Sequence, residues 1–80
     1  MDYEVLVQLK AEVLDPEGRA IHETLRAQGI KDIAGVSVAK RYVVRLDASA
    51  ANPLAIIEDV ARRYLANPVS ETFSIKRLDA

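Results

Sequence analysis

The stretch that decides the fold is Tyr3–Ala20, YEVLVQLKAEVLDPEGRA, in which a strand pattern passes directly into the start of a helix. From Tyr3 to Val13 the odd-numbered positions hold Tyr, Val, Val, Leu, Ala and Val, whereas the even-numbered ones are mostly Glu, Gln and Lys. Alternation with a period of two predicts a strand with one buried face. Asp15 before Pro16 then predicts a helix start, because the aspartate side chain can accept hydrogen bonds from the free amides and proline removes no needed donor.

The segment after Asp15 is predicted to be a helix that ends at Gly29. Ile21 and Leu25 lie four residues apart and are the apolar residues of one helix face. Glycine readily adopts the positive φ that often ends a helix. Gly18 falls in the first turn, where glycine costs roughly 0.5–1 kcal/mol relative to alanine. Either this cost is simply tolerated, or Gly18 is required because some backbone or ligand approaches closely there.

The middle of the chain, from Val36 to Leu46, is predicted to be one long strand. Five of its apolar residues share one phase and are even-numbered: Val36, Val38, Tyr42, Val44 and Leu46. A two-residue turn at Ala39-Lys40 would move Tyr42 to the opposite face and would lack the Gly or Asn that such turns favour. A turn over residues 39–41 would keep the phase. The segment is therefore one long strand, straight or bent, or a hairpin, and we favour the single strand.

Asn52-Pro53 repeats the cap-and-proline pattern and predicts the start of a second helix. Apolar residues follow at helical spacing: Leu54, Ile57, Ala61 and Tyr64. Asn67-Pro68 is expected to end this helix, because proline disfavours helical geometry in the residue before it. Phe73 and Ile75 then mark a final strand.

The predicted order is β-α-β-α-β in a single domain that spans residues 1–80. Two helices on one face of a mostly antiparallel sheet give an α+β fold. Leu6 and Val43 would project from the opposite face of this sheet. Either another chain covers them, as an oligomer interface, or they are two ordinary exposed aliphatic side chains.

Composition excludes several classes of protein. Eleven basic residues against twelve acidic ones give a net charge of −1, and a near-neutral chain is a poor candidate for binding nucleic acid. No apolar stretch approaches the roughly 20 residues that cross a bilayer, and Met1-Asp2-Tyr3-Glu4 is not the basic start of a signal peptide. With no cysteine either, we expect a cytoplasmic chain without a membrane or nucleic-acid partner. A homo-oligomer would stabilise so small a domain.

Candidate catalytic chemistry is sparse. His22 is the only histidine, and it lies beside the apolar stripe of the first helix without a nucleophile phrase or a second ligand nearby. It could be a general base, but a solvated helix histidine is the favoured interpretation. A metal would need three or four converging ligands, and none are spaced for one. The sequence therefore predicts neither a catalytic residue nor a metal site.

Two phrases carry a family resemblance, and Lys40 lies between them. They are Leu14-Asp15-Pro16-Glu17-Gly18-Arg19-Ala20 and Leu65-Ala66-Asn67-Pro68-Val69. An LDP-x-G phrase at the start of the first helix is specific when an LAN-x-V phrase follows the second helix. The chain resembles the PurS family, the small subunit of phosphoribosylformylglycinamidine synthase, over nearly its whole length.

The resemblance implies a place in de novo purine biosynthesis. In that family a large synthetase subunit uses ATP to turn formylglycinamide ribonucleotide into formylglycinamidine ribonucleotide, and a glutaminase subunit supplies ammonia from glutamine. A PurS dimer bridges the two and contributes no catalytic residue to this carbon–nitrogen ligase. The resemblance thus implies a homodimer or dimer of dimers, with the synthetase and glutaminase subunits as further partners. It also implies no cofactor in this chain, with ATP and Mg²⁺ on the synthetase subunit.

Matched position by position, the two phrases and the middle strand imply candidates for the partner interface. Together with the neighbouring Arg41, these candidates are Asp15, Gly18, Arg19, Lys40 and Asn67. The basic pair Lys40-Arg41 could dock an acidic surface, or it could simply be solvated. The chain departs from the family where many relatives have Arg-x-Gly-Lys, because it has Ser37-Val38-Ala39-Lys40; Pro68 replaces a common threonine.

The main alternative is a small-molecule sensing module of the amino-acid-binding type, which uses a similar α+β layout. Such a module should present glycine-rich loops at a cleft between subunits, and this chain has only three glycines, which are dispersed. A stand-alone enzyme is the weakest interpretation, because it would need a buried cluster of titratable groups.

Overall fold

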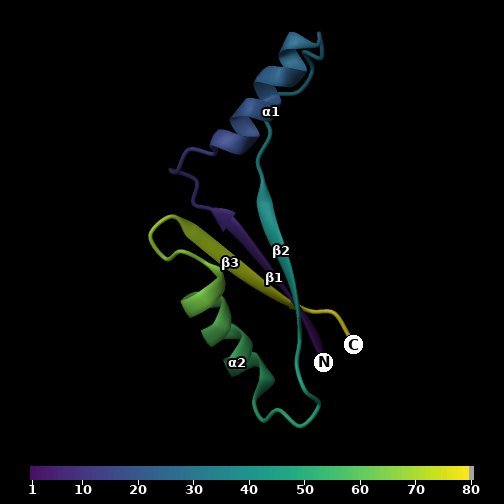
Figure 1. The fold of residues 1–80 in the computed structure, drawn as a ribbon, viewed down its shortest axis with the longest axis vertical. Helices are drawn as coiled ribbons and strands as arrows, with labels where there is room; N and C mark the ends of the chain where they lie inside the picture. Colours follow the sequence, from purple (N-terminus) through teal and green to yellow (C-terminus); the bar gives the residue numbers. More distant parts are fainter. Residues whose placement is uncertain (80) are drawn as a thin grey trace.

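The computed structural model describes residues 1–79. Three strands, two helices and a π-helical turn follow one another along the chain (Figure 1). They are β1 (Asp2–Leu9), α1 (Pro16–Ala27), β2 (Ala39–Arg45), α2 (Pro53–Val60), η1 (Ala61–Leu65) and β3 (Glu71–Arg77). The predicted element order is confirmed. In this part of the chain no helix is long and apolar enough to cross a membrane.

The strands form one antiparallel sheet in the order β2-β1-β3. Val5 in the central strand lies opposite Tyr42 on one side and Ile75 on the other. The α+β class is confirmed, and the middle segment is a single strand rather than a hairpin. This strand is shorter than the predicted Val36–Leu46, because its pairing with β1 stops at Gln8–Ala39 and leaves residues 36–38 without a strand beside them.

The core lies between the sheet and α2. The odd-numbered side chains of β1 face α2, as the period-two pattern predicts. The buried residues of this core are Tyr3, Val5, Val7, Ile57 and Ala61, each at most 5% exposed. We refer to the sheet, α2 and η1 together as the body.

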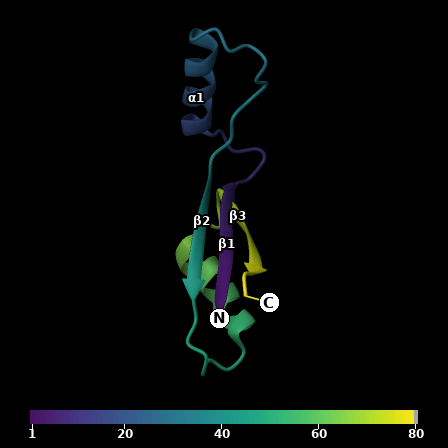
Figure 2. The same ribbon diagram turned by 90° about the vertical axis from the view of Figure 1, so that its right-hand side faces the viewer.

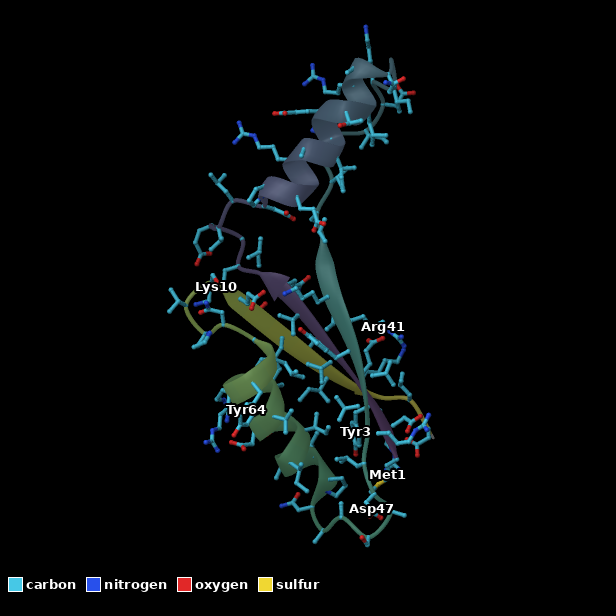
Figure 3. The ribbon with its side chains drawn as sticks, in the orientation of Figure 1. Met1, Tyr3, Lys10, Arg41, Asp47 and Tyr64 are labelled. Atoms are coloured by element: carbon cyan, nitrogen blue, oxygen red, sulfur yellow. The ribbon has the colours of Figure 1, made fainter. Side chains whose placement is uncertain are left out.

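Tyr64 departs from the predicted apolar face of the second helix, since 71% of it is exposed. The helix widens at η1, where the amide of Ala66 donates to the carbonyl oxygen of Ala61 over 2.9 Å. A π-helical turn advances the chain by a smaller angle per residue than an α-helix. Tyr64 therefore rotates away from the strands (Figure 3), and Leu65 packs against the core instead.

All four helix ends lie at the predicted signals, although one of them is capped differently. The Asp15 side chain caps α1, and Gly29 has a φ of 88° just after that helix. The second helix ends before Asn67-Pro68, as predicted. Asn52-Pro53 starts α2, as predicted, but Asn52 does not cap the helix through its side chain. It has a φ of 54° and makes no side-chain capping bond, because asparagine tolerates the left-handed conformation and turns the chain here through its backbone.

The position of α1 differs from the predicted layer, because α1 extends beyond the end of the sheet while α2 alone covers its face (Figures 1 and 2). We call residues 16–35, which comprise α1 and the segment that returns from it, the arm. The radius of gyration is 16.3 Å, whereas a compact domain of this length would have about 12 Å. The chain is 53 Å long and 13 Å thick in its longest and shortest directions.

Candidate functional site

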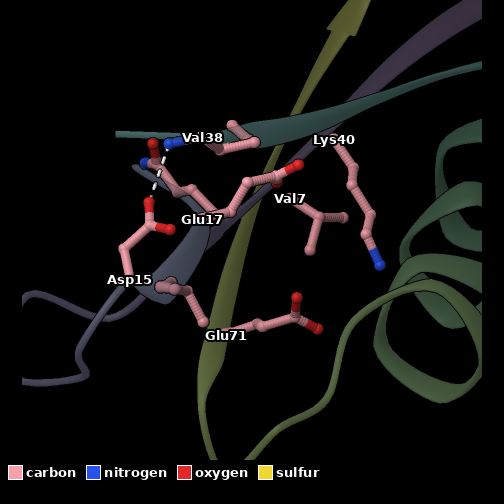
Figure 4. Close-up of a pocket in the computed structure, with 9 residues that line it drawn as sticks. Val7, Asp15, Glu17, Val38, Lys40 and Glu71 are labelled. Carbon is pink, nitrogen blue, oxygen red and sulfur yellow. Dashed lines mark hydrogen bonds between the residues drawn. The ribbon is translucent and has the colours of Figure 1, made fainter. Parts of the chain in front are cut away.

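The chain passes between the body and the arm twice, at residues 10–15 and 36–38, and we call these two crossings the neck. Asp15 bridges the two crossings with its two carboxylate oxygens. Oδ1 accepts from the amide of Gly18 over 2.9 Å. Oδ2 accepts from the amide of Val38 over 2.8 Å (Figure 4). These hydrogen bonds, that of Gly18 first, hold the pKa of Asp15 below its ordinary value of 3.8, because they stabilise the ionised form.

Gly18 is buried in the first turn of α1. A Cβ atom built at this position would lie only 2.2 Å from the carbonyl oxygen of Val36. The sequence left open whether Gly18 is merely tolerated or required by a close approach. The structure answers this question, because the backbone of the returning segment passes too near for any side chain.

A cavity of 210 Å³ lies at the base of the neck, where the first family phrase meets the sheet (Figure 4). It brings together Asp15 and Lys40, which are 25 positions apart in the sequence. The residues that line it are Val7, Gln8, Leu9, Asp15, Glu17, Val38, Ala39, Lys40 and Glu71. Three carboxylates and one ammonium group thus share a small open depression.

Asn67, in the second family phrase, organises the loop before β3. Its side-chain oxygen accepts from the backbone amide of Val69 over 2.9 Å, and its backbone amide donates to Oε1 of Glu71 over 2.7 Å. Lys10 also holds this loop, because its Nζ donates to the carbonyl oxygen of Pro68 over 2.9 Å. Asn67 does not line the cavity, but it orders the loop that leads into Glu71.

The two candidate arginines lie elsewhere. Arg19 is exposed on the arm and pairs with Glu23, with 3.8 Å between Nε and Oε1. Arg41 projects from the face of the sheet opposite α2 and pairs with Glu4. Val43, on the same face, is 51% exposed, whereas Leu6 is half-buried. The structure therefore separates the candidates into a neck, an arm surface and an open sheet face.

His22 has a structural contact in the arm. Its Nε2 lies 2.8 Å from the carbonyl oxygen of Ile33, which ties α1 to the segment that returns from it. Among residues 1–79, no three histidine, aspartate or glutamate side chains are grouped as metal ligands. The contact of His22 therefore helps to hold the arm together.

Sequence reasoning missed Glu71 and the backbone groups of Val36 and Val38. Glu71 belongs to the predicted final strand, and nothing in its local pattern shows that β3 pairs beside the neck. Val38 is 23 residues from Asp15, so their hydrogen bond depends on how the arm returns. Glu17 could have been found, because it lies inside the first family phrase.

Comparisons with known proteins agree on one family. The family model for PurS, phosphoribosylformylglycinamidine (FGAM) synthase, matches residues 2–79. The PurS subunit of phosphoribosylformylglycinamidine synthase from Archaeoglobus fulgidus is 36% identical over 73 residues, which are 90% of this chain and 91% of that protein.

Two solved structures extend this similarity to the fold. One is Methanocaldococcus jannaschii PurS, a subunit of formylglycinamide ribonucleotide amidotransferase, with 29% identity and a TM-score of 0.83 over 94% of this chain and 92% of that one. The other, PurLQS from Thermotoga maritima, has a TM-score of 0.83 over 96% and 95% of the two chains, but at 23% identity it supports the fold alone. These similarities favour the synthase subunit over the amino-acid sensor. The chain belongs to the PurS family of phosphoribosylformylglycinamidine synthase subunits.

Proposed function

We propose that this chain is the non-catalytic connecting subunit of its synthase, and that it bridges the glutaminase and synthetase subunits so that ammonia passes between them. The observation that carries this proposal is the shape of the molecule. A body with five buried core residues carries an arm that extends beyond the end of the sheet. Such a shape offers much surface for its size, which suits a connector. The related Thermotoga maritima fold belongs to an assembly named PurLQS.

In this assembly the reaction takes place on the other subunits. ATP and Mg²⁺ are bound by the synthetase subunit, and no three histidine, aspartate or glutamate side chains of residues 1–79 are grouped to hold a metal ion. Its own residues position the glutaminase against the synthetase and keep water away from the ammonia path. Membership in the PurS family of purine-biosynthesis subunits supports a cytoplasmic location for this work.

Reconstitution of the synthase from its purified subunits tests the bridging role. We expect omission of this chain to abolish product formation from glutamine, because ammonia would no longer reach the synthetase. Product formation from added ammonium salt should partly survive, because that route does not need the glutaminase. Full glutamine-dependent turnover without the chain would contradict the proposal.

The same proposal includes a homodimer, because two apolar surfaces of the described chain lack a cover. The first is the arm, where Ile21, Ile30 and Ile33 are 42%, 45% and 36% exposed. The second is the open sheet face with Leu6 and Val43. Burial of apolar area stabilises association by roughly 25 cal/mol per Å² before the cost of ordering is subtracted. A second copy that packs on the arm would bury apolar side chains in addition to the small core of the body.

The remaining partner-interface candidates are polar or charged and lie outside the neck contacts of Asp15 and Gly18. Arg19 projects from the arm, and Lys40 and Arg41 lie on the edge strand β2. We propose these basic side chains, with the Asn67 loop, as contacts for the larger subunits. Replacing Lys40 by Glu should weaken binding of a partner subunit, measured by calorimetry, without changing the dimer. Unchanged binding would remove β2 from the interface.

A further inference from the structure

We propose that Asp15 and Gly18 lock the arm at a fixed angle to the body, so that the arm is pre-organised to dock on a second copy. The inference rests on the homodimer proposed above and adds the residues that set its geometry. In this interpretation Asp15 and Gly18 occur in the first family phrase because the closely packed neck requires these two residue types. Asp15 and Gly18 then act within their own chain rather than as direct contacts to the larger subunits.

The carboxylate of Asp15 has a geometry that an amide or a hydroxyl cannot reproduce. One oxygen caps the first turn of α1 at Gly18, and the other accepts from Val38 at the start of the returning strand region. A single charged side chain therefore joins the arm to the chain segment that re-enters the sheet. Asparagine keeps one acceptor oxygen and turns the other position into a donor, so it can satisfy only one of the two amides.

Gly18 fixes the second contact of the neck. Its missing side chain lets α1 lie directly against the carbonyl oxygen of Val36, where a Cβ would be at 2.2 Å. The atom in the way belongs to the backbone, so it cannot swing aside as the end of a flexible side chain could. Alanine at this position must therefore tilt α1 away from the returning segment.

The neck matters because little else directs the arm. The arm projects beyond the sheet, so the buried residues of the body do not hold it in place (Figures 1 and 2). If the neck loosens, the arm samples many directions, and docking must then select one of them. Pre-organisation improves affinity mainly by removing this ordering cost. A loose neck should weaken the dimer while the body keeps its fold.

Two matched pairs of variants test the neck. Gly18→Ala is compared with Gly35→Ala, because a Cβ at Gly35 meets nothing within 4 Å. Asp15→Asn is compared with Asp47→Asn, because the Asp47 carboxylate also accepts from a backbone amide, that of Ser49 over 3.1 Å, but in a turn outside the arm. Sedimentation equilibrium over a dilution series measures the dimer dissociation constant, and far-ultraviolet circular dichroism confirms that each variant is folded.

We expect Gly18→Ala and Asp15→Asn to raise the dimer dissociation constant about tenfold or more, a loss of the size expected when a hydrogen bond to a charged group is removed. Gly35→Ala and Asp47→Asn should leave it unchanged. If both neck variants dimerise as tightly as the wild-type chain, the proposal is overturned. Should Gly18→Ala fail to fold, Asp15→Asn still decides the question.

A second measurement separates the neck from the dimer. The chain has no cysteine, so spin labels can be attached to cysteines introduced by Gln28→Cys at the arm and Lys76→Cys on the body. In doubly labelled chains diluted with unlabelled ones, pulsed spin resonance should give a narrow distance distribution that broadens in Gly18→Ala and Asp15→Asn. A wild-type chain that stays monomeric defeats the homodimer but not the neck. A broad distribution in the wild-type chain defeats the neck, whether or not the dimer forms.

Discussion

The body and the arm differ in whether they bury a core of apolar side chains. Val5 and Ile57 of the body are fully buried, whereas Ile21 of the arm is 42% exposed although it belongs to a well-capped helix. Helices in proteins are stabilised mostly by the packing of an apolar face rather than by intrinsic propensity. The body is therefore stabilised by its own buried core, whereas the arm depends on the neck and on whatever covers its apolar face.

The largest expected effect is a loss of stability when the core of the body is changed. Ile57→Ala removes a fully buried side chain between α2 and β1, and substitutions of this kind lower the free energy of unfolding by about 2–5 kcal/mol. Ile21→Ala on the arm should lower it by less than about 1 kcal/mol in the monomer, because much of that side chain is already in water. Urea denaturation at low protein concentration measures both. Equal losses would show that the arm is part of the same core.

The next effect concerns association rather than folding. Ile21→Glu places a charge on the apolar stripe of the arm, and glutamate is a good helix former, so α1 should persist. We expect the dimer dissociation constant to rise at least about tenfold, because a charge would have to be buried or the contact given up. Sedimentation velocity measures this change.

Ala27→Glu is the matched control for this substitution. Ala27 is exposed in the last turn of α1, and at helical spacing it lies away from the stripe of Ile21 and Leu25. The same charge there should leave the dimer intact. If the two variants weaken the dimer equally, the arm acts through its total charge and not through its apolar stripe.

A smaller effect appears in acid. The pKa of Asp15 is held below its ordinary value of 3.8 by the amides of Gly18 and Val38, so the unfolded chain binds the proton more readily than the folded one. Stability from Asp15 is therefore complete above about pH 5 and is lost as the pH falls through 3.8 and below. The unfolding midpoints of wild type and Asp15→Asn in urea should differ near pH 6, and the difference should shrink as the pH is lowered toward 3.

Other charged groups near Asp15 make this comparison necessary. Glu17, Lys40 and Glu71 line the same cavity, and the pKa of Asp47 is also lowered, by the amide of Ser49. These groups are present in both the wild-type chain and Asp15→Asn, so the difference between the two curves isolates Asp15. A difference that stays constant from pH 6 to pH 3 would mean that Asp15 acts without its charge.

Local patterns predicted the helices and strands well, because their periods and end signals lie close together along the chain. Alternation from Tyr3 onward identified the buried face of β1, and Asp15 and Gly29 marked the ends of α1. The same patterns could not show where α1 lies. The stripe of Ile21 and Leu25 indicates that one face needs a cover, but it does not say whether the cover is the chain's own sheet or another molecule.

The candidate site was predictable only in part for a related reason. Asp15 stood out because aspartate is a favoured capping residue, and Gly18 because glycine is costly in the first turn of a helix. Their partners did not stand out, since Val36 and Val38 contribute only backbone atoms and any residue has those. Likewise, the widening at η1 that turns Tyr64 outward leaves no mark in the apolar spacing.

The smallest expected effect concerns exposed ion pairs, which occur in both regions. Asp59 and Arg63 on α2 are separated by 3.4 Å, and their side chains are 53% and 62% exposed; the Arg19–Glu23 pair on the arm is exposed to a similar degree. Such pairs contribute about 0.2–0.5 kcal/mol on a helix surface. Asp59→Asn and Glu23→Gln should therefore each change the free energy of unfolding, measured in urea, by no more than about 0.5 kcal/mol. A loss above about 1 kcal/mol for Glu23→Gln alone would mean that charge pairing, rather than the neck, stabilises the arm.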